Sequence, residues 1–137
     1  MARLYYLLSV AQHRVSTVAN RGAEQELGLS AAQLGALFVI EKSPDLRQSE
    51  LAKALSCTKP AVTSLAQRLE DAGLTERRPC PDDGRATRLR LTRKGKRVVQ
   101  KGKAHVATLQ AMLCEGYSDE EIAVVARFLG TAIERFE

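Results

Sequence analysis

The sequence contains no tryptophan, and only 4% of its residues are aromatic. Alanine, leucine and valine must therefore fill most of the core, which favours packed helices over a sheet sandwich. No apolar run approaches the roughly 20 residues that a membrane-spanning helix needs. The N-terminal stretch MARLYYLLSVAQHR continues in a helical pattern without a cleavage signature, so we interpret it as the start of a long helix and not as a signal peptide.

Cysteine is also scarce, and the three cysteines lie far apart at positions 57, 80 and 114. An odd number without paired spacing argues against a disulfide framework, and the absence of any CxxC pattern argues against a structural zinc site. His13 and His105 lack metal-ligand spacing. We therefore expect a cytoplasmic protein without a metal or cofactor. No nucleophile–base pair or phosphate-binding loop suggests an enzyme.

Apolar residues recur at helical spacing in six segments of the chain. Two of the expected helix starts, at Ser30 and Ser118, have the spacing of a capping box. Thr58 is a good N-cap for another helix, with Pro60 in its first turn, where the missing N–H is harmless. The predicted helices cover residues 4–27, 31–43, 48–55, 58–71, 92 to 111 or 113, and 118–136.

Between residues 74 and 91 the pattern changes from helix to strand. Residues 74–78 have strand character, PCPDDG is typical of a turn, and residues 86–91 alternate polar and apolar side chains. We expect a two-stranded hairpin with Cys80 exposed on it. The predicted fold is mainly α with a small β-hairpin, namely a single domain with a winged helix-turn-helix in residues 30–91. Residues 1–29 and 92–137 would form long terminal helices whose apolar stripes indicate a homodimer.

The segment LAKALSCTKPAVTSLAQRLEDAG has the layout of a helix-turn-helix. Its second helix would bury one apolar stripe and turn small or hydrogen-bonding residues outward. A B-DNA major groove, about 12 Å wide, accepts one such helix. Gln67 and Thr63 suit adenine edges and thymine methyl groups, whereas Lys59 and Arg68 suit phosphates.

Basic residues are concentrated in and after the hairpin. Residues 75–103 hold eleven Lys or Arg against three Asp or Glu, a net charge of +8, whereas the rest of the chain carries −3. Arg85 lies near the hairpin tip, where an arginine can enter a narrow minor groove, and Asp83 could orient its guanidinium. The predicted DNA-binding residues are Ser49, Thr58, Lys59, Pro60, Thr63, Ser64, Gln67, Arg68, Arg85 and Arg88.

From Leu51 to Gly95 the chain resembles the MarR family of bacterial regulators. LAKAL and AVTSLAQRLEDAGLTERRPCPDDGRATRLRLTRKGK carry the resemblance, with the family's D-x-R element at Asp83-Gly84-Arg85. The resemblance implies a homodimeric winged-helix repressor or activator that binds double-stranded DNA at a pseudo-palindromic operator. It also implies release from DNA by a small aromatic ligand or an oxidant. Ser64 stands where many relatives have Arg, and Pro60 where many have Ser or Thr, so the operator sequence stays open.

Three alternatives remain at this stage. Cys57 precedes a helix N-terminus, a position that can make a thiol reactive and would suit a redox switch. A hydrolase could instead use Cys57 or Cys80 with a histidine. A winged helix that serves only protein contacts is the third, although such proteins usually lose the basic wing.

Overall fold

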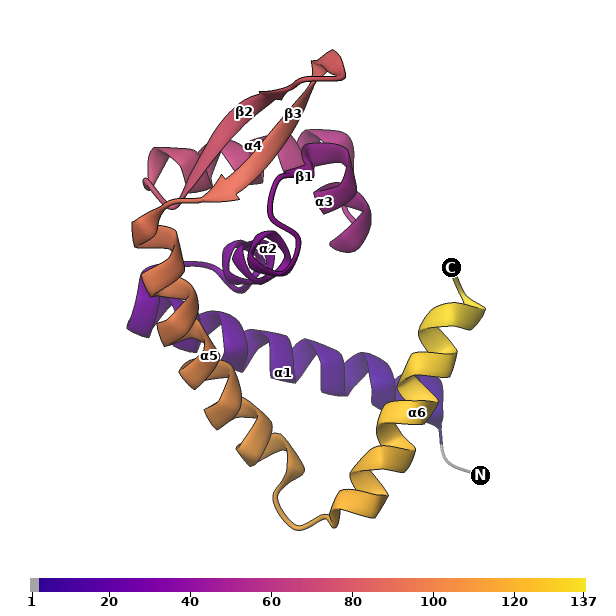
Figure 1. Ribbon diagram of the computed structural model, residues 1–137. Helices are drawn as coiled ribbons and strands as arrows, with labels where there is room; N and C mark the ends of the chain where they lie inside the picture. The colour runs from indigo at the N-terminus through magenta and orange to yellow at the C-terminus, as the bar shows by residue number, and fades with distance from the viewer. Residues whose placement is uncertain (1–2) are drawn as a thin grey trace. The chain divides into compact units, whose positions relative to one another are not determined.

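The computed structural model describes residues 3–137, apart from the side chains of Asp83 and Arg85. The chain divides into two compact units, of which the first ends at His105 and the second comprises Val106–Glu137. Figure 1 shows helices α1 (Leu4–Leu27), α2 (Ala31–Lys42), α3 (Gln48–Ala54), α4 (Lys59–Asp71), α5 (Arg93–Cys114) and α6 (Asp119–Arg135), and strands β1 (Leu46–Arg47), β2 (Thr75–Cys80) and β3 (Asp83–Leu91). The expected helices are confirmed, with boundaries close to those predicted.

The helix ends follow from local chemistry. Ser30 Oγ accepts the Gln33 N–H at 3.1 Å, and the Gln33 side chain accepts the Ser30 N–H at 2.8 Å, as the capping-box spacing predicted. Gly28 ends α1 in the left-handed region at φ 69°, a conformation that costs glycine little. The helix α3 begins at Gln48, and the N–H of the preceding Arg47 donates to Glu50 Oε1 at 3.0 Å.

The sheet has three antiparallel strands in the order β1-β3-β2, one more than the expected hairpin. In the extra strand, β1, Leu46 pairs with Leu89 and Arg47 with Arg88. Two residues are too few to show a period in the sequence, so β1 could not be recognised there. The hairpin strands also run further than predicted, because β2 extends to Cys80 and β3 begins at Asp83.

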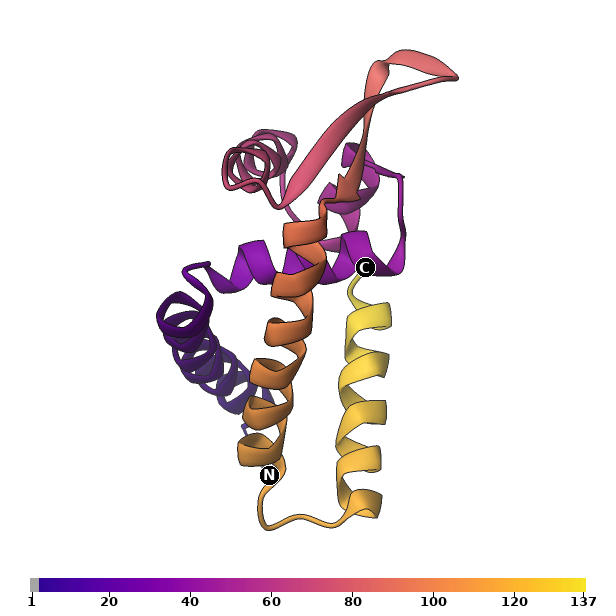
Figure 2. The same cartoon turned by 60° about the vertical axis from the view of Figure 1, so that its left-hand side comes forward.

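One hydrophobic core joins the helix-turn-helix to the sheet. Leu37 of α2, Leu51 of α3, Leu69 of α4 and Leu89 of β3 are all fully buried. Each such side chain contributes roughly 1.5–3 kcal/mol relative to exposure. Because α3, α4 and the strands share this core, they hold fixed positions relative to one another, while the hairpin projects away from the helices (Figure 2).

Cys80 does not lie where the sequence suggested. It is 2% exposed, because β2 continues to this residue and packs its side chain inward. The expectation of an exposed cysteine on the hairpin was therefore wrong. Cys57, which lies just before α4, is partly exposed.

The helix α6 has a different character. Every described residue of α6 is at least partly exposed, including Val125, Phe128 and Ile133. Within the described residues, none of the helices is both long enough and apolar enough to cross a membrane.

Candidate nucleic-acid interface

The outer face of α4 gathers most of the predicted DNA-binding residues. Thr58 Oγ1 accepts the Ala61 N–H at 3.3 Å and fixes the start of the helix. Val62, Ala66 and Leu69 are buried, so the opposite side of the helix faces outward. Six of the predicted residues line one shallow depression on that side: Lys59, Pro60, Thr63, Ser64, Gln67 and Arg68. Ser49 and Thr58 are also exposed.

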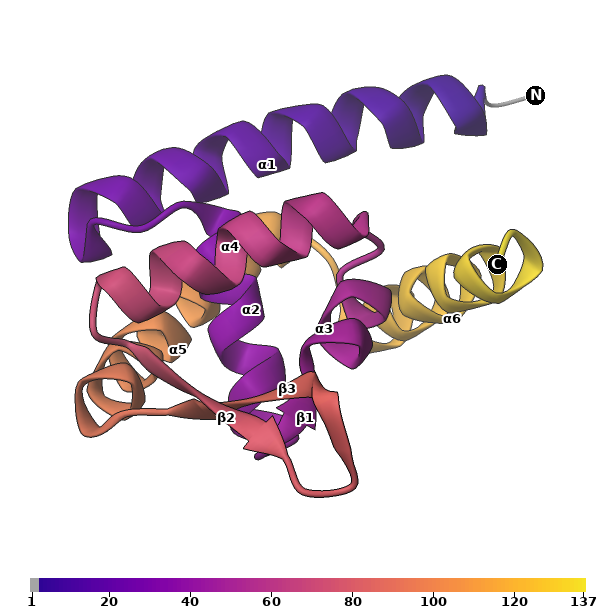
Figure 3. The same ribbon diagram turned by 90° about the horizontal axis from the view of Figure 1, so that it is seen from above.

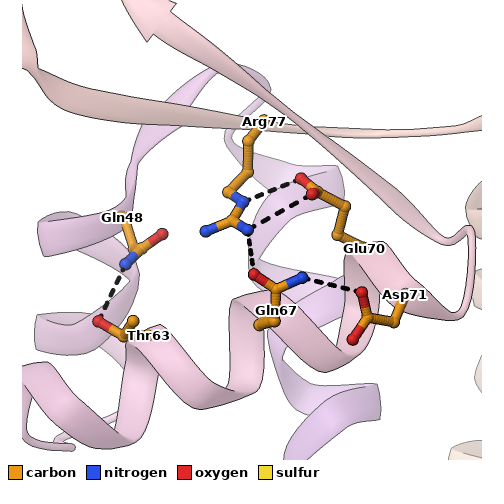
Figure 4. Close-up of polar contacts among 6 residues, drawn as sticks. All are labelled: Gln48, Thr63, Gln67, Glu70, Asp71 and Arg77. Atoms are coloured by element: carbon orange, nitrogen blue, oxygen red, sulfur yellow. Dashed lines mark hydrogen bonds and ion pairs between the residues drawn. The ribbon is translucent and has the colours of Figure 1, made fainter.

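The first helix of the helix-turn-helix contacts this face through Gln48. Its Nε2 donates to Thr63 Oγ1 at 3.3 Å, and that hydroxyl donates to the Lys59 carbonyl at 2.9 Å. The Thr63 rotamer is thus held from two sides, and Figure 4 shows the contact with Gln48. Such a held threonine directs its methyl group consistently, as a contact to a thymine methyl would need.

Gln67 is part of a larger polar network on the same face, drawn in Figure 4. Its carbonyl oxygen accepts a hydrogen bond from Arg77 Nη2, and its Nε2 donates to Asp71 Oδ1 at 2.8 Å. Arg77 lies on β2 and also donates from Nε to Glu70 Oε2 at 2.9 Å. The network links α4 to β2, the first strand of the hairpin.

Arg88 and Arg90 of β3 are held from the loop before β1. Arg90 donates to both carboxylate oxygens of Asp45, at 3.1 and 2.9 Å. Arg88 donates to the Asp45 carbonyl at 3.0 Å and to Cys80 Sγ at 3.4 Å. Arg88, a predicted DNA contact, therefore also anchors the wing. The predicted contacts of Arg85 and Asp83 lie outside the described side chains.

Both carboxylates in these contacts are stabilised as anions. Hydrogen bonding from Arg90 lowers the pKa of Asp45, and hydrogen bonding from Arg77 lowers the pKa of Glu70, in each case against the opposing effect of desolvation. These ion pairs therefore stay charged at neutral pH. Within the described residues, no group of three or more His, Cys, Asp or Glu is placed to hold a metal ion.

Sequence reasoning identified the outer face of α4 but not its partners. Asp71 stands four residues after Gln67, a spacing that signals a side-chain pair on one helix face. Arg77 and Gln48 carry no comparable signal, since their contacts span 10 and 15 residues between different elements. The link from Asp45 to Arg90 spans 45 residues and depends on the position of β1 beside β3.

Comparison with known proteins gives one family. Residues 27–86 match the model of the MarR family, a range that covers α2, α3, α4 and most of the wing. A solved structure of a mutant MarR from E. coli has 25% identity and a TM-score of 0.81, and the alignment covers 97% of this chain and 98% of that one.

Two further solved structures are similar over nearly their whole length. The S. aureus MepR–DNA complex has a TM-score of 0.88 at 24% identity, covering 98% of this chain and 99% of that one. PcaV from Streptomyces coelicolor, solved with its natural ligand, has a TM-score of 0.83 at 19% identity. The alignment covers 100% of this chain and 99% of that one. The winged helix-turn-helix architecture and the resemblance seen in the sequence are thereby confirmed.

Proposed function

We propose that this chain, a winged-helix protein of the MarR family, is a transcriptional regulator that binds double-stranded DNA. The exposed face of α4 carries the proposal, because it presents Lys59, Arg68 and hydrogen-bonding side chains beside a basic hairpin on the same core. Seen from above in Figure 3, α4 and the hairpin of β2 and β3 both lie on the viewer's side of α2. A helix for the major groove beside a slender hairpin for the minor groove is the geometry that winged-helix recognition needs. The MepR–DNA complex supports this reading by analogy.

The proposed contacts divide into two kinds. Thr63, Ser64 and Gln67 would face base edges, whereas the charged Lys59 and Arg68 would bind phosphates. At the ends of the interface, Ser49, Thr58 and Pro60 would follow the DNA backbone. Arg85 would enter the minor groove, and Arg88 would support the wing as well as the DNA.

The proposed assembly is a homodimer formed through the terminal helices. Tyr5, Tyr6 and Leu7 of α1, and Ile133 and Phe136 at the end of the chain, are all more than half exposed in the single chain. A protein that works alone rarely leaves so many large apolar side chains in water. Two copies related by a dyad would read a pseudo-palindromic operator.

Regulation by a small aromatic molecule is the finer part of the proposal. PcaV was solved with its natural ligand, and this supports a small-molecule effector by analogy. In the proposed mechanism the chain is a repressor that its ligand releases from DNA. An oxidant is the alternative effector, acting at the partly exposed Cys57. Burial makes Cys80 a poorer target for an oxidant.

Duplex binding under varied salt tests the proposal. Sequences enriched from random duplexes provide the operator, and its affinity is then measured between 50 and 200 mM salt. If about 6–10 phosphates are contacted per dimer, affinity should fall by roughly 10³–10⁵-fold over this range. A flat salt dependence, or no duplex binding, would instead favour a winged helix that serves protein contacts.

A further inference from the structure

The amide of Gln67 is held in one orientation by two groups of opposite charge. On one side Arg77 can only donate, and it binds the amide oxygen. On the other side the Asp71 carboxylate only accepts, and it binds the amide nitrogen at 2.8 Å. Rotating the amide by half a turn would place donor against donor and acceptor against acceptor. Both neighbours therefore select the same orientation, as Figure 4 shows.

This orientation leaves one hydrogen-bonding position free on each end of the amide. The nitrogen keeps a second N–H, and the oxygen keeps a second lone pair. Adenine recognition uses one acceptor and one donor from the amide, for the adenine N6 amino group and N7. A free glutamine can present these groups in either order, but Gln67 in this network presents them in one order only.

We infer that Arg77 and Asp71 are specificity-determining positioning residues, which fix the hydrogen-bonding polarity that Gln67 presents to a base pair. The inference rests on the proposed function and names two residues beyond the predicted contact set. Arg77 suits the role because Glu70 holds it in turn, with Nε to Oε2 at 2.9 Å and a side chain only 26% exposed. The arginine therefore acts from a fixed position on β2.

The neighbouring Arg78 is a matched control for Arg77. It lies on the same strand, but its side chain is 52% exposed and pairs with Glu76 at 3.7 Å. Changing either arginine to alanine removes one positive charge near the DNA, so both variants should lose general affinity. Only Arg77→Ala should also loosen base preference.

The experiment measures duplex affinity for the enriched operator and for operators changed at single positions. Gln67→Ala identifies the position that Gln67 reads, as the one where discrimination falls by about 5-fold or more. We expect Arg77→Ala to reduce discrimination at that same position, Arg77→Lys to retain part of it, and Arg78→Ala to leave it as in wild type. Thermal unfolding of each variant checks that the fold is kept.

Asp71→Ala is a second, independent test of whether the neighbours of Gln67 position its amide. Removing an acidic residue near DNA should raise general affinity or leave it unchanged, whereas Arg77→Ala should lower it. Both changes should nevertheless reduce discrimination at the Gln67 position. A loss of preference common to both variants, with affinity lowered by Arg77→Ala but not by Asp71→Ala, cannot arise from charge alone.

Three results would overturn the inference. Unchanged discrimination in Arg77→Ala would mean that Arg77 does not position Gln67. If Arg77→Ala reduces discrimination in the Gln67→Ala background as much as it does in wild type, Arg77 contacts the base itself. No effect of Gln67→Ala at any position would remove Gln67 as a reader. By contrast, a wild-type protein that enriches no sequence at all would overturn the proposed function, and this inference with it.

Discussion

The basic side chains of the wing differ in what holds them, and their charge alone does not reveal this. Arg90 has both carboxylate oxygens of Asp45 as partners, and Arg88 is bound to the Asp45 carbonyl and to a buried thiol. A side chain held in this way would keep its charge near the proposed DNA but has fewer donors left for phosphates. At the scale of single residues, binding and anchoring are therefore separate properties that need separate measurements.

Asp45 should make the stability of the wing depend on pH. Its pKa is lowered chiefly by the hydrogen bond from Arg90, so the folded state binds the proton less readily than the unfolded chain does. The stabilisation is complete above the pKa of the unfolded chain, about 4, and disappears as the pH falls through the lower folded value. Asp45→Asn keeps a residue type that tolerates the observed φ of 61°.

We expect Asp45→Asn to be less stable than wild type at pH 7, with a difference that shrinks as the pH approaches 3. Urea unfolding of both proteins at stepped pH values measures this difference. A difference that stays constant across the range would show that charge is not the cause.

Arg85 and Arg88 should respond differently to truncation. Arg85 follows the hairpin turn in the sequence, and we expect Arg85→Ala to change stability by less than about 0.5 kcal/mol while strongly reducing operator affinity. Arg85→Lys should recover only part of that affinity, since an ammonium lacks the planar fork. Arg88→Ala removes contacts to Asp45 and Cys80 and should cost about 1 kcal/mol of stability.

Melting temperature and duplex affinity of the same variants separate these roles. Wild-type affinity in Arg85→Ala would remove the wing arginine from DNA recognition. An unchanged melting temperature in Arg88→Ala would mean that its internal contacts do not stabilise the wing.

At the scale of elements, the start of α5 is tied to the end of α4. Thr92 Oγ1 donates to the Gly73 carbonyl at 2.6 Å and accepts the Gly95 N–H at 3.0 Å. The Thr92 N–H donates to the Leu74 carbonyl at 3.0 Å. The helix therefore begins in direct contact with the backbone that enters the wing, and this contact leaves no room at Gly95.

Two glycines in helices should give opposite effects when changed to alanine. A Cβ at Gly95 would lie 2.1 Å from the Leu74 carbonyl oxygen, so Gly95→Ala should destabilise the protein by about 1–3 kcal/mol. No described atom lies within 4 Å of the corresponding position at Gly35 in α2. Gly35→Ala should therefore stabilise the protein by about 0.5–1 kcal/mol through helix propensity alone. Thermal or urea unfolding checks both, and equal effects would contradict the close approach at Gly95.

The elements that could be predicted from the sequence are those whose signals are local. The caps at Ser30, Thr58 and Ser118 lie within three residues of their partners, and all three are present. The strand β1 and the burial of Cys80 depend instead on pairing between distant segments. The outer face of α4 was predictable from helical period, whereas the contact of Arg77 with Gln67 required the position of β2 beside α4.

At the scale of the whole molecule, apolar surface is distributed unevenly along the chain. The largest fully buried side chains belong to α2, α3, α4, the sheet and the start of α5. The N-terminal part of α1 and the whole of α6 contribute no residue to that core. These segments can bury their apolar side chains only by contact with other surfaces, and a second copy of the chain offers surfaces of the same kind.

A charge placed on the apolar face of α6 should therefore break the proposed homodimer. Val125 is 50% exposed and shares a helical face with Ile122 and Leu129, so Val125→Asp would place a carboxylate among apolar side chains. We expect wild type to sediment as a dimer at micromolar concentration and Val125→Asp to shift towards monomer. Thr131→Asp is the control, because it adds the same charge to an exposed position on the other side of the helix.

Since a monomer contacts one half-site only, Val125→Asp should also lose operator affinity and show a smaller salt dependence, while Thr131→Asp should keep both. A stable wild-type monomer would contradict the homodimer, and dissociation by Thr131→Asp alone would place the interface on the opposite face of α6.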